Sequence, residues 1–173
     1  MAKNNYTLLY IGVFMMLILT ACHEKTVYHD YQEASSSGWE KNDPLSFHVP
    51  PIKETGNYVE EVGLRINGSF PFQNLNLIIE QTRKNTGERL CDTLVCKLIS
   101  KQGYPEGRGI SEYQYTFPLK TLQLEKGDSL YIEIRHDMKR EILPGITDIG
   151  IKLSKVSKTQ KIATRIQSQE DKQ

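Results

Sequence analysis

The sequence predicts an all-β protein, formed by a single antiparallel β-sandwich of the jelly-roll or immunoglobulin-like kind. Several short segments alternate apolar and polar residues with a period of two, which is typical of strands with one buried face. Combinations of glycine, proline and asparagine that favour tight turns separate these segments. No stretch shows a sustained helical period between capping residues, so the helical crossovers of a parallel sheet are not expected.

The first residues have the features of a lipoprotein signal peptide, predicted over 1–21. An apolar segment over 8–19 follows Lys3, and at about 12 residues it is shorter than a membrane span but typical of a signal-peptide core. It ends in Leu19-Thr20-Ala21-Cys22, which resembles the bacterial lipobox. Cys22 is therefore predicted to become the first residue of the mature chain and to carry fatty acids such as palmitate. The alternative is an uncleaved signal anchor, which the short apolar segment disfavours.

The mature chain is long enough for one domain but not for two. Residues 22–38 contain a serine-glycine cluster and scattered charges, which predicts a lipidated N-terminus followed by a tether. The ordered domain is expected to begin near Val27 or at Trp39, with the sandwich assigned to 39–153. Residues 154–173 are rich in lysine, glutamine and serine, which predicts a disordered polar tail.

The strands are expected in order along this domain. Clear period-two patterns occur at 62–66, 75–79, 94–98, 130–134 and 149–153, and weaker ones at 45–49 and 113–117. Turn sequences lie between them, at 67–68, 85–87, 126–128 and 143–145. The inward residues of these strands form the expected core: Val62, Leu64, Ile66, Leu77, Ile79, Leu94, Leu130, Ile132, Ile134, Ile149 and Ile151.

Charge and cysteine content narrow the possible functions. The chain has 22 Lys plus Arg against 21 Asp plus Glu, so it lacks the large excess of one sign of charge that would indicate a nucleic-acid partner.

Cys91 and Cys96 are the thiols left once Cys22 is acylated. On one extended strand their Cα atoms would lie about 16 Å apart, too far for a disulfide unless the chain turns between them. Otherwise they are small core or near-core residues.

The sequence contains no recognisable catalytic constellation. Its histidines are scattered without metal-ligand spacing, and no nucleophile elbow, phosphate-binding glycine loop or EF-hand pattern is present. The expectation is therefore a protein that is not an enzyme and needs no metal or cofactor. A small hydrolase using His136 or His48 is a weaker alternative, because His136 and Asp137 are neighbours on a strand and should diverge.

A second alternative is carbohydrate binding by exposed aromatic rings. Trp39 and several tyrosines could form a flat stacking platform on the sandwich, among them Tyr28, Tyr31, Tyr104, Tyr113 and Tyr115. The simpler interpretation is that Trp39 anchors the core and that most tyrosines are half-buried in strands. Three exposed, coplanar rings on one face would decide for the sugar-binding alternative.

Several motifs in order along the chain resemble the GldH family of gliding-motility lipoproteins of Bacteroidetes. These are the lipobox, Trp39 with Asp43 and Phe47, Tyr58, Leu64-Arg65-Ile66, Phe70-Pro71-Phe72-Gln73-Asn74-Leu75, Asp92-Thr93-Leu94, Gly107-Arg108-Gly109, and the segment 143–151. The resemblance implies a non-enzymatic envelope lipoprotein whose partners are other motility or secretion proteins, besides the membrane lipid that holds Cys22. It supplies no catalytic residues. Outer-membrane anchoring is expected, and the segment after Cys22 lacks an acidic run, which favours a periplasm-facing position.

The long segment 101–110 is the expected partner-binding loop. It exceeds what closing a hairpin requires, and it presents Tyr104 and Arg108, residue types that often dominate interface energy. Near the last strand, Asp148 is expected to be exposed beside the Pro144-Gly145 turn. If Asp148 points inward instead, it needs a partner such as Arg65 or Arg135.

Overall fold

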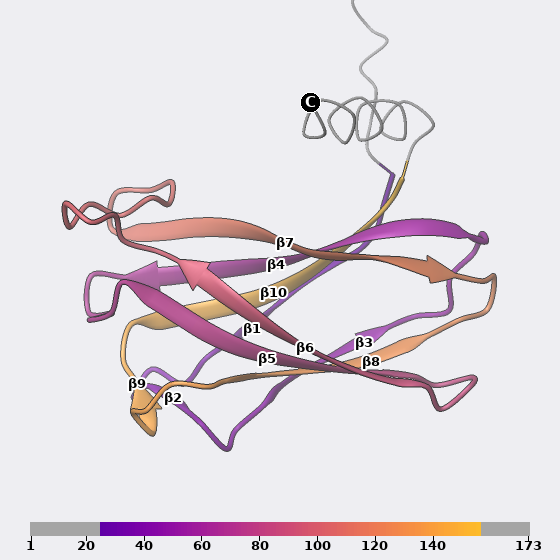
Figure 1. Ribbon diagram of the computed structural model, residues 1–173, viewed down its shortest axis with the longest axis horizontal. Helices are drawn as coiled ribbons and strands as arrows, with labels where there is room; N and C mark the ends of the chain where they lie inside the picture. Colours follow the sequence, from indigo (N-terminus) through magenta and orange to yellow (C-terminus); the bar gives the residue numbers. More distant parts are fainter. Residues whose placement is uncertain (1–24, 157–173) are drawn as a thin grey trace, which may run out of the picture.

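The computed structural model of the protein describes residues 25–156 and contains ten strands in that range. They are β1 (Lys25–Glu33), β2 (Trp39–Glu40), β3 (Leu45–Val49), β4 (Gly56–Asn67), β5 (Asn74–Arg83), β6 (Arg89–Lys97), β7 (Glu112–Leu124), β8 (Leu130–His136), β9 (Ile142–Leu143) and β10 (Ile146–Lys155). The all-β class predicted from the sequence is confirmed (Figure 1). Within the described residues, no helix is long and apolar enough to cross a membrane.

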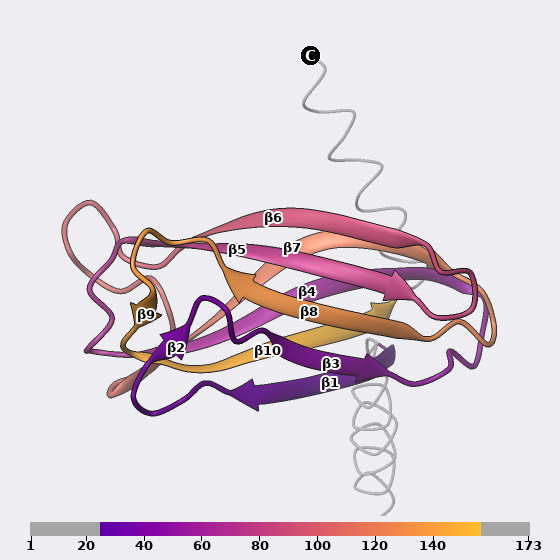
Figure 2. The ribbon, with the colours of Figure 1, turned by 90° about the horizontal axis from the view of Figure 1, so that it is seen from below.

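Two four-stranded sheets form the layers of the sandwich (Figure 2). One has the order β1-β10-β4-β7 and the other β3-β8-β5-β6, while β2 and β9 make a small ribbon at one end. Every strand pair is antiparallel. Successive long strands cross from one sheet to the other, except β5 and β6, which form a hairpin within one sheet. This connectivity is the double Greek key of a jelly roll. An immunoglobulin-like sandwich would instead place its first two strands side by side in one sheet.

The core follows the period-two pattern. Ten of the eleven expected core residues are buried, whereas Leu94 is only half-buried because it lies on β6, an edge strand. Trp39 is buried as expected, and its indole N–H donates to the Asp43 carbonyl at 2.8 Å. Cys91 and Cys96 both lie on β6 and are unpaired, the first exposed and the second buried.

Of the two expected starts of the ordered domain, the structure agrees with the one near Val27, so the assignment of the sandwich to 39–153 begins too late. Lys25–Glu33 forms β1, which pairs with β10 from Lys25↔Lys155 to Glu33↔Asp148, so most of the expected tether belongs to the sandwich. This strand escaped prediction because it is an edge whose inward positions are largely polar: Asp30 and Gln32 sit opposite Ile151 and Ile149. The signal peptide, Cys22 and the tail beyond Val156 lie outside the described residues. The last strand continues to Lys155, two residues past the expected boundary at 153.

Asp148 is buried rather than exposed, which corrects the expectation for this residue. Its side chain lies 3.5 Å from Arg65 on the adjacent strand, one of the two partners considered from the sequence. The Arg65 guanidinium also lies 4.6 Å from the centre of the Tyr31 ring, a cation–π contact. That ring covers Gly63 and Gly150, where any Cβ atom would collide with it. The two glycines therefore let Tyr31 lie flat on the outer face of the sheet.

Candidate partner-binding site

The segment 98–111, which we call the β6–β7 loop, is held in shape by backbone hydrogen bonds. Ile99 and Pro105 form an isolated antiparallel bridge, and the Ser100 N–H donates to the Tyr104 carbonyl at 2.8 Å. Further along, the backbones of Arg108 and Gln114 exchange two hydrogen bonds of 3.0 and 2.9 Å, which ties the loop to β7. A loop fixed in this way loses less conformational entropy when a partner binds.

Two glycines permit the close approach of the loop to β7. Gly107 lies against the Tyr115 ring, where an added Cβ would sit 2.6 Å from ring carbons. Gly109 has a φ of +149°, and an added Cβ would collide with the backbone of Glu112. Tyr115 in turn donates its hydroxyl hydrogen to the Leu98 carbonyl at 2.8 Å. The Gly107-Arg108-Gly109 motif is thus explained by the packing of the loop on Tyr115, and it holds Arg108 at the surface.

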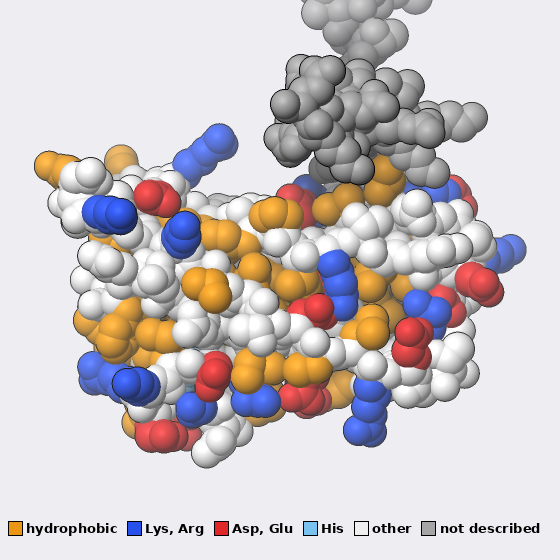
Figure 3. All heavy atoms as spheres, viewed as in Figure 1, with side chains coloured by type: hydrophobic (Ala, Val, Ile, Leu, Met, Phe, Trp, Pro, Cys, Tyr) orange, Lys and Arg blue, Asp and Glu red, His pale blue; other side chains and the backbone are white. Residues whose placement is uncertain are grey.

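The loop carries the most exposed apolar side chains of the domain. Ile110 is 95% exposed and Tyr104 is 73% exposed, against 56% for Val95 on β6 and 45% for Ile142 on β9. Figure 3 shows hydrophobic atoms at the tips of this loop, which projects at the upper left. The expectation of an exposed Tyr104 is confirmed. Ile110 was not singled out from the sequence, although an isoleucine beside a glycine in a long loop was a usable signal.

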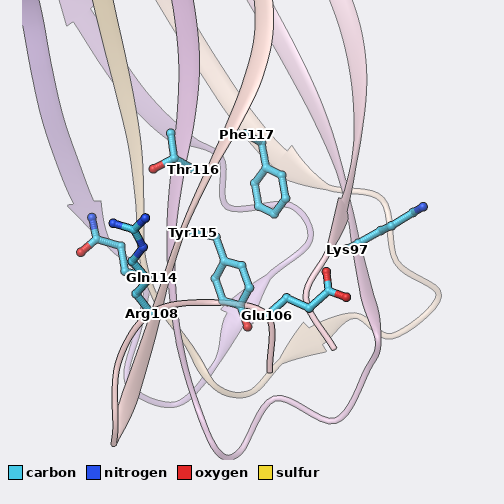
Figure 4. A pocket seen from close by; sticks show the side chains of 7 residues that line it. All are labelled: Lys97, Glu106, Arg108, Gln114, Tyr115, Thr116 and Phe117. Carbon is cyan, nitrogen blue, oxygen red and sulfur yellow. The ribbon is translucent and has the colours of Figure 1, made fainter. Parts of the chain in front are cut away.

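A groove lies next to the loop, on the side of the sandwich where β6 and β7 are the edge strands of the two sheets. We call this the open side. The groove has a volume of about 560 Å³ and is lined by Lys97, Glu106, Arg108 and residues 114–117 of β7. Figure 4 shows the Tyr115 and Phe117 rings on one side of β7, stacked with centroids 6.0 Å apart, and Arg108 and Gln114 on the other side of that strand. Arg108 is thus a lining residue at the rim of β7, whereas Tyr104 does not line the groove.

The open side also exposes unpaired strand edges. Among the described residues, β6 pairs with β5 alone, and β7 pairs with β4 alone apart from the Arg108–Gln114 bridge. Such edges offer backbone N–H and C=O groups to a further strand from another chain. Pro118 has no N–H to offer, and an ion pair of Lys120 with Asp92 joins the two edges further along. Beside the loop, the backbone of Gln114 is already hydrogen-bonded to Arg108. Among the described residues, strand addition to β7 is therefore limited to the short stretch between Gln114 and Pro118.

A carboxyl group is buried beneath the same side. Glu60 is 0% exposed, and its Oε2 accepts a hydrogen bond of 2.7 Å from Gln81 Nε2. Within the described residues, neither Glu60 Oε1 nor Gln81 Oε1 has a hydrogen-bond partner. Burial raises the pKa of Glu60 to about 7, and the nearby charge of Asp92 raises it as well. The hydrogen bond from Gln81 and the charge of Lys120 act in the opposite direction and lower this pKa. A proton on Glu60 Oε1 would give this carboxyl a donor toward Gln81 Oε1, and so satisfy both acceptors.

This buried acid predicts a pH-dependent stability. Because the pKa of Glu60 rises from 4.5 to about 7 on folding, the folded chain binds more protons than the unfolded chain between these values. The free energy of unfolding should therefore fall as pH rises from about 4.5 to about 7, by about 3 kcal/mol from this group. Glu60→Gln keeps an amide partner for Gln81 and should flatten the profile. Urea unfolding of both proteins across this range tests it, and parallel profiles would contradict it.

The histidines do not assemble a catalytic group in the part of the chain described. His136 is buried, and its Nε2 lies 3.2 Å from the Trp39 carbonyl, whereas its neighbour Asp137 is exposed and pairs with Lys41 at 3.5 Å. Burial lowers the pKa of His136. His48 is exposed and packs its ring on Tyr131. Residues 25–156 contain no cluster of three or more His, Cys, Asp or Glu side chains able to hold a metal ion.

The aromatic platform required for sugar binding is not formed by the described residues. Tyr104 is the one exposed tyrosine, tryptophan or phenylalanine among them. Of the other tyrosines considered from the sequence, Tyr28, Tyr31 and Tyr113 are half-buried and Tyr115 is buried. Of the four exposed large hydrophobic side chains among the described residues, the two most exposed, Ile110 and Tyr104, lie on the β6–β7 loop.

Fold and surface together define a jelly-roll domain that carries an ordered, apolar-tipped loop beside an open sheet edge. The chain belongs to the GldH lipoprotein family, whose family model matches residues 26–153. It is 26% identical over 151 residues to the gliding motility lipoprotein GldH of Flavobacterium johnsoniae, covering 82% of this chain and 94% of that protein. A GldH homologue of Christiangramia forsetii is 24% identical over 155 residues, covering 84% and 94%.

Among solved structures, a family GH115 4-O-methyl-α-glucuronidase with specificity for decorated arabinogalactans resembles the domain weakly. The TM-score is 0.41 at 14% identity, over 79% of this chain and 18% of the enzyme. This similarity is too low to support a functional comparison.

Proposed function

We propose that this chain is a membrane-anchored envelope lipoprotein of a gliding-motility machinery, and that it acts without catalysis by binding another envelope protein. The names of its relatives support the machinery, and the family supports the anchored state. The observation that carries the binding role is the β6–β7 loop, where Tyr104 and Ile110 expose their apolar side chains from a backbone held by hydrogen bonds.

Physical considerations favour this loop as a protein-binding surface. Tyrosine and arginine are the residue types most enriched where binding energy concentrates, and here Tyr104 and Arg108 are four residues apart on one loop. The adjoining groove offers charged Lys97 and Glu106 around the Tyr115 and Phe117 rings, which resembles the mixed apolar and polar composition of protein interfaces. The partner class is an envelope protein of the motility or secretion machinery.

The proposal places the protein at the outer membrane, attached through acyl chains on Cys22 and facing the periplasm. The lipobox and the family support the lipid anchor. The side of the membrane is proposed from the absence of an acidic run after Cys22 in the sequence.

The binding role is tested by Tyr104→Ala combined with Arg108→Ala. Removing one anchor residue of an interface commonly costs about 2 kcal/mol, so capture of envelope partners by the tagged lipoprotein should fall roughly 30-fold or more. Both side chains are exposed, and the backbone hydrogen bonds of the loop do not need them, so folding and lipidation should remain intact. The measurement is crosslinking in cells followed by purification and quantification of the captured proteins.

The matched control is Glu125→Ala combined with Lys126→Ala. These exposed residues lie in the turn that follows β7, at the end of that strand far from the loop. The control variant should capture the same partners in the same amounts as the parent. If the loop variant also captures them undiminished while folding normally, the loop is only a connector.

A further inference from the structure

Both ends of the described chain leave the domain at the same place. Lys25, the first residue of β1, pairs with Lys155, the last residue of β10. Cys22 precedes Lys25 by three residues, and three residues span at most about 11 Å even when fully extended. If Cys22 carries the acyl anchor, as the proposed function holds, this end of the domain cannot stand further than that from the membrane surface.

The surface at this end is basic and partly apolar. A shallow hollow of about 210 Å³ is lined there by Lys25, Lys53 and Lys155 together with Val27, Pro50 and Pro51. Glu54 is the acidic residue of this lining, and its carboxylate pairs with both Lys25 and Lys155, at 2.7 Å for Lys155. Three lysines against one glutamate leave an excess of positive charge. Lys53 and the two prolines are exposed.

We propose that this end, formed by Lys25, Lys53, Lys155 and Pro50-Pro51, lies against the phospholipid headgroups of the leaflet that holds the acyl chains. Lysine ammonium groups are attracted to phosphate groups at a membrane surface, and a lipid anchor combined with basic residues binds more firmly than an acyl chain alone. The chain leaves too little length between Cys22 and Lys25 for another protein to be held between this surface and the membrane.

The proposed orientation determines how far the β6–β7 loop lies from the membrane surface. In the sheet register, Lys155 lies opposite Tyr58, which lies opposite Leu122, close to the end of β7. The β6–β7 loop joins the other end of that strand, at Glu112, about 30 Å away at the usual rise per residue. Figure 1 shows the loop at one end of the long axis and the start of β1 toward the other. The loop is thus presented away from the membrane.

The test uses the full acylated chain in vesicles of phosphatidylethanolamine and phosphatidylglycerol. In a Cys91→Ser background, which removes the exposed thiol of the described domain, a fluorophore is attached to Lys53→Cys or, as the matched control, to Gln102→Cys in the loop. Lipids with a nitroxide on the headgroup should quench the fluorophore at position 53 several-fold more than the fluorophore at position 102. Equal quenching, or stronger quenching at position 102, would overturn the orientation.

The intact mass of the purified chain separates this inference from the proposed function. If the purified chain carries no acyl groups, both the proposed anchor and the proposed orientation are contradicted. If the chain is acylated but shows the reverse quenching pattern, the orientation alone is contradicted. In an acylated chain, Lys25→Gln, Lys53→Gln and Lys155→Gln together should reduce the quenching difference, whereas the control Lys139→Gln, at an exposed residue that follows β8 at the other end of the domain, should leave it unchanged.

Discussion

Replacing Cys22 with serine should leave the protein without acyl groups and release it from the membrane fraction. The thiol is the group that receives the first lipid in the predicted lipobox, and a serine hydroxyl does not replace it. Several acyl chains hold a protein stably at a bilayer, so the loss should be close to complete.

Metabolic labelling with a fatty-acid analogue, followed by detergent phase partitioning, measures this effect. Cys91→Ser is the matched control, because it also removes a free thiol and should keep both the label and the membrane association. Label retained by Cys22→Ser would show that the lipid is attached elsewhere.

The largest expected effect on stability comes from Ile132→Ala. Ile132 is 0% exposed and lies in the middle of β8, opposite Phe47 on β3 and Gln81 on β5. Truncation removes packed apolar atoms and leaves a cavity, which should lower the free energy of unfolding by about 2 to 5 kcal/mol. Since small domains have total stabilities of about 5 to 15 kcal/mol, a change of this size threatens the fold.

Denaturant unfolding of Ile132→Ala against Ile110→Ala tests the assigned faces of the sheet. Both variants lose the same atoms, but Ile110 is 95% exposed and should cost little. Equal midpoints for the two variants would mean that β8 is shifted by one residue, which would exchange its buried and exposed faces.

The sequence was most informative where the strands are central and half-buried. The alternation around Leu64, Leu77 and Ile132 predicted the buried faces correctly, because burial of one face imposes a period of two. It was least informative at the edge strand β1. This strand places the polar residues Asp30 and Gln32 toward the interior, so its sequence lacks the alternation of apolar and polar residues that identifies a strand. The choice of a jelly roll over an immunoglobulin-like sandwich depended on long-range pairing such as β1 with β10, which local patterns do not encode.

The candidate site was predicted in part. The long loop, the exposed Tyr104 and the exposed Arg108 follow from loop length and residue type, and the structure places them as expected. The groove could not be predicted, because it forms between two strand edges whose separation depends on the packing of the sheets. Glu60 was missed for a different reason: an acidic residue next to Glu61 suggests a solvated face, although the period counted back from Val62 points it inward.

The most direct measurement of the binding role is photocrosslinking from the β6–β7 loop in living cells. A photoreactive aromatic amino acid replaces Tyr104 in the lipidated protein, and in a second strain the same amino acid replaces Lys126 at the far end of β7. Light should produce a discrete adduct with an envelope protein from position 104 and none from position 126. The absence of an adduct from position 104, or the same adduct from both positions, would contradict the account.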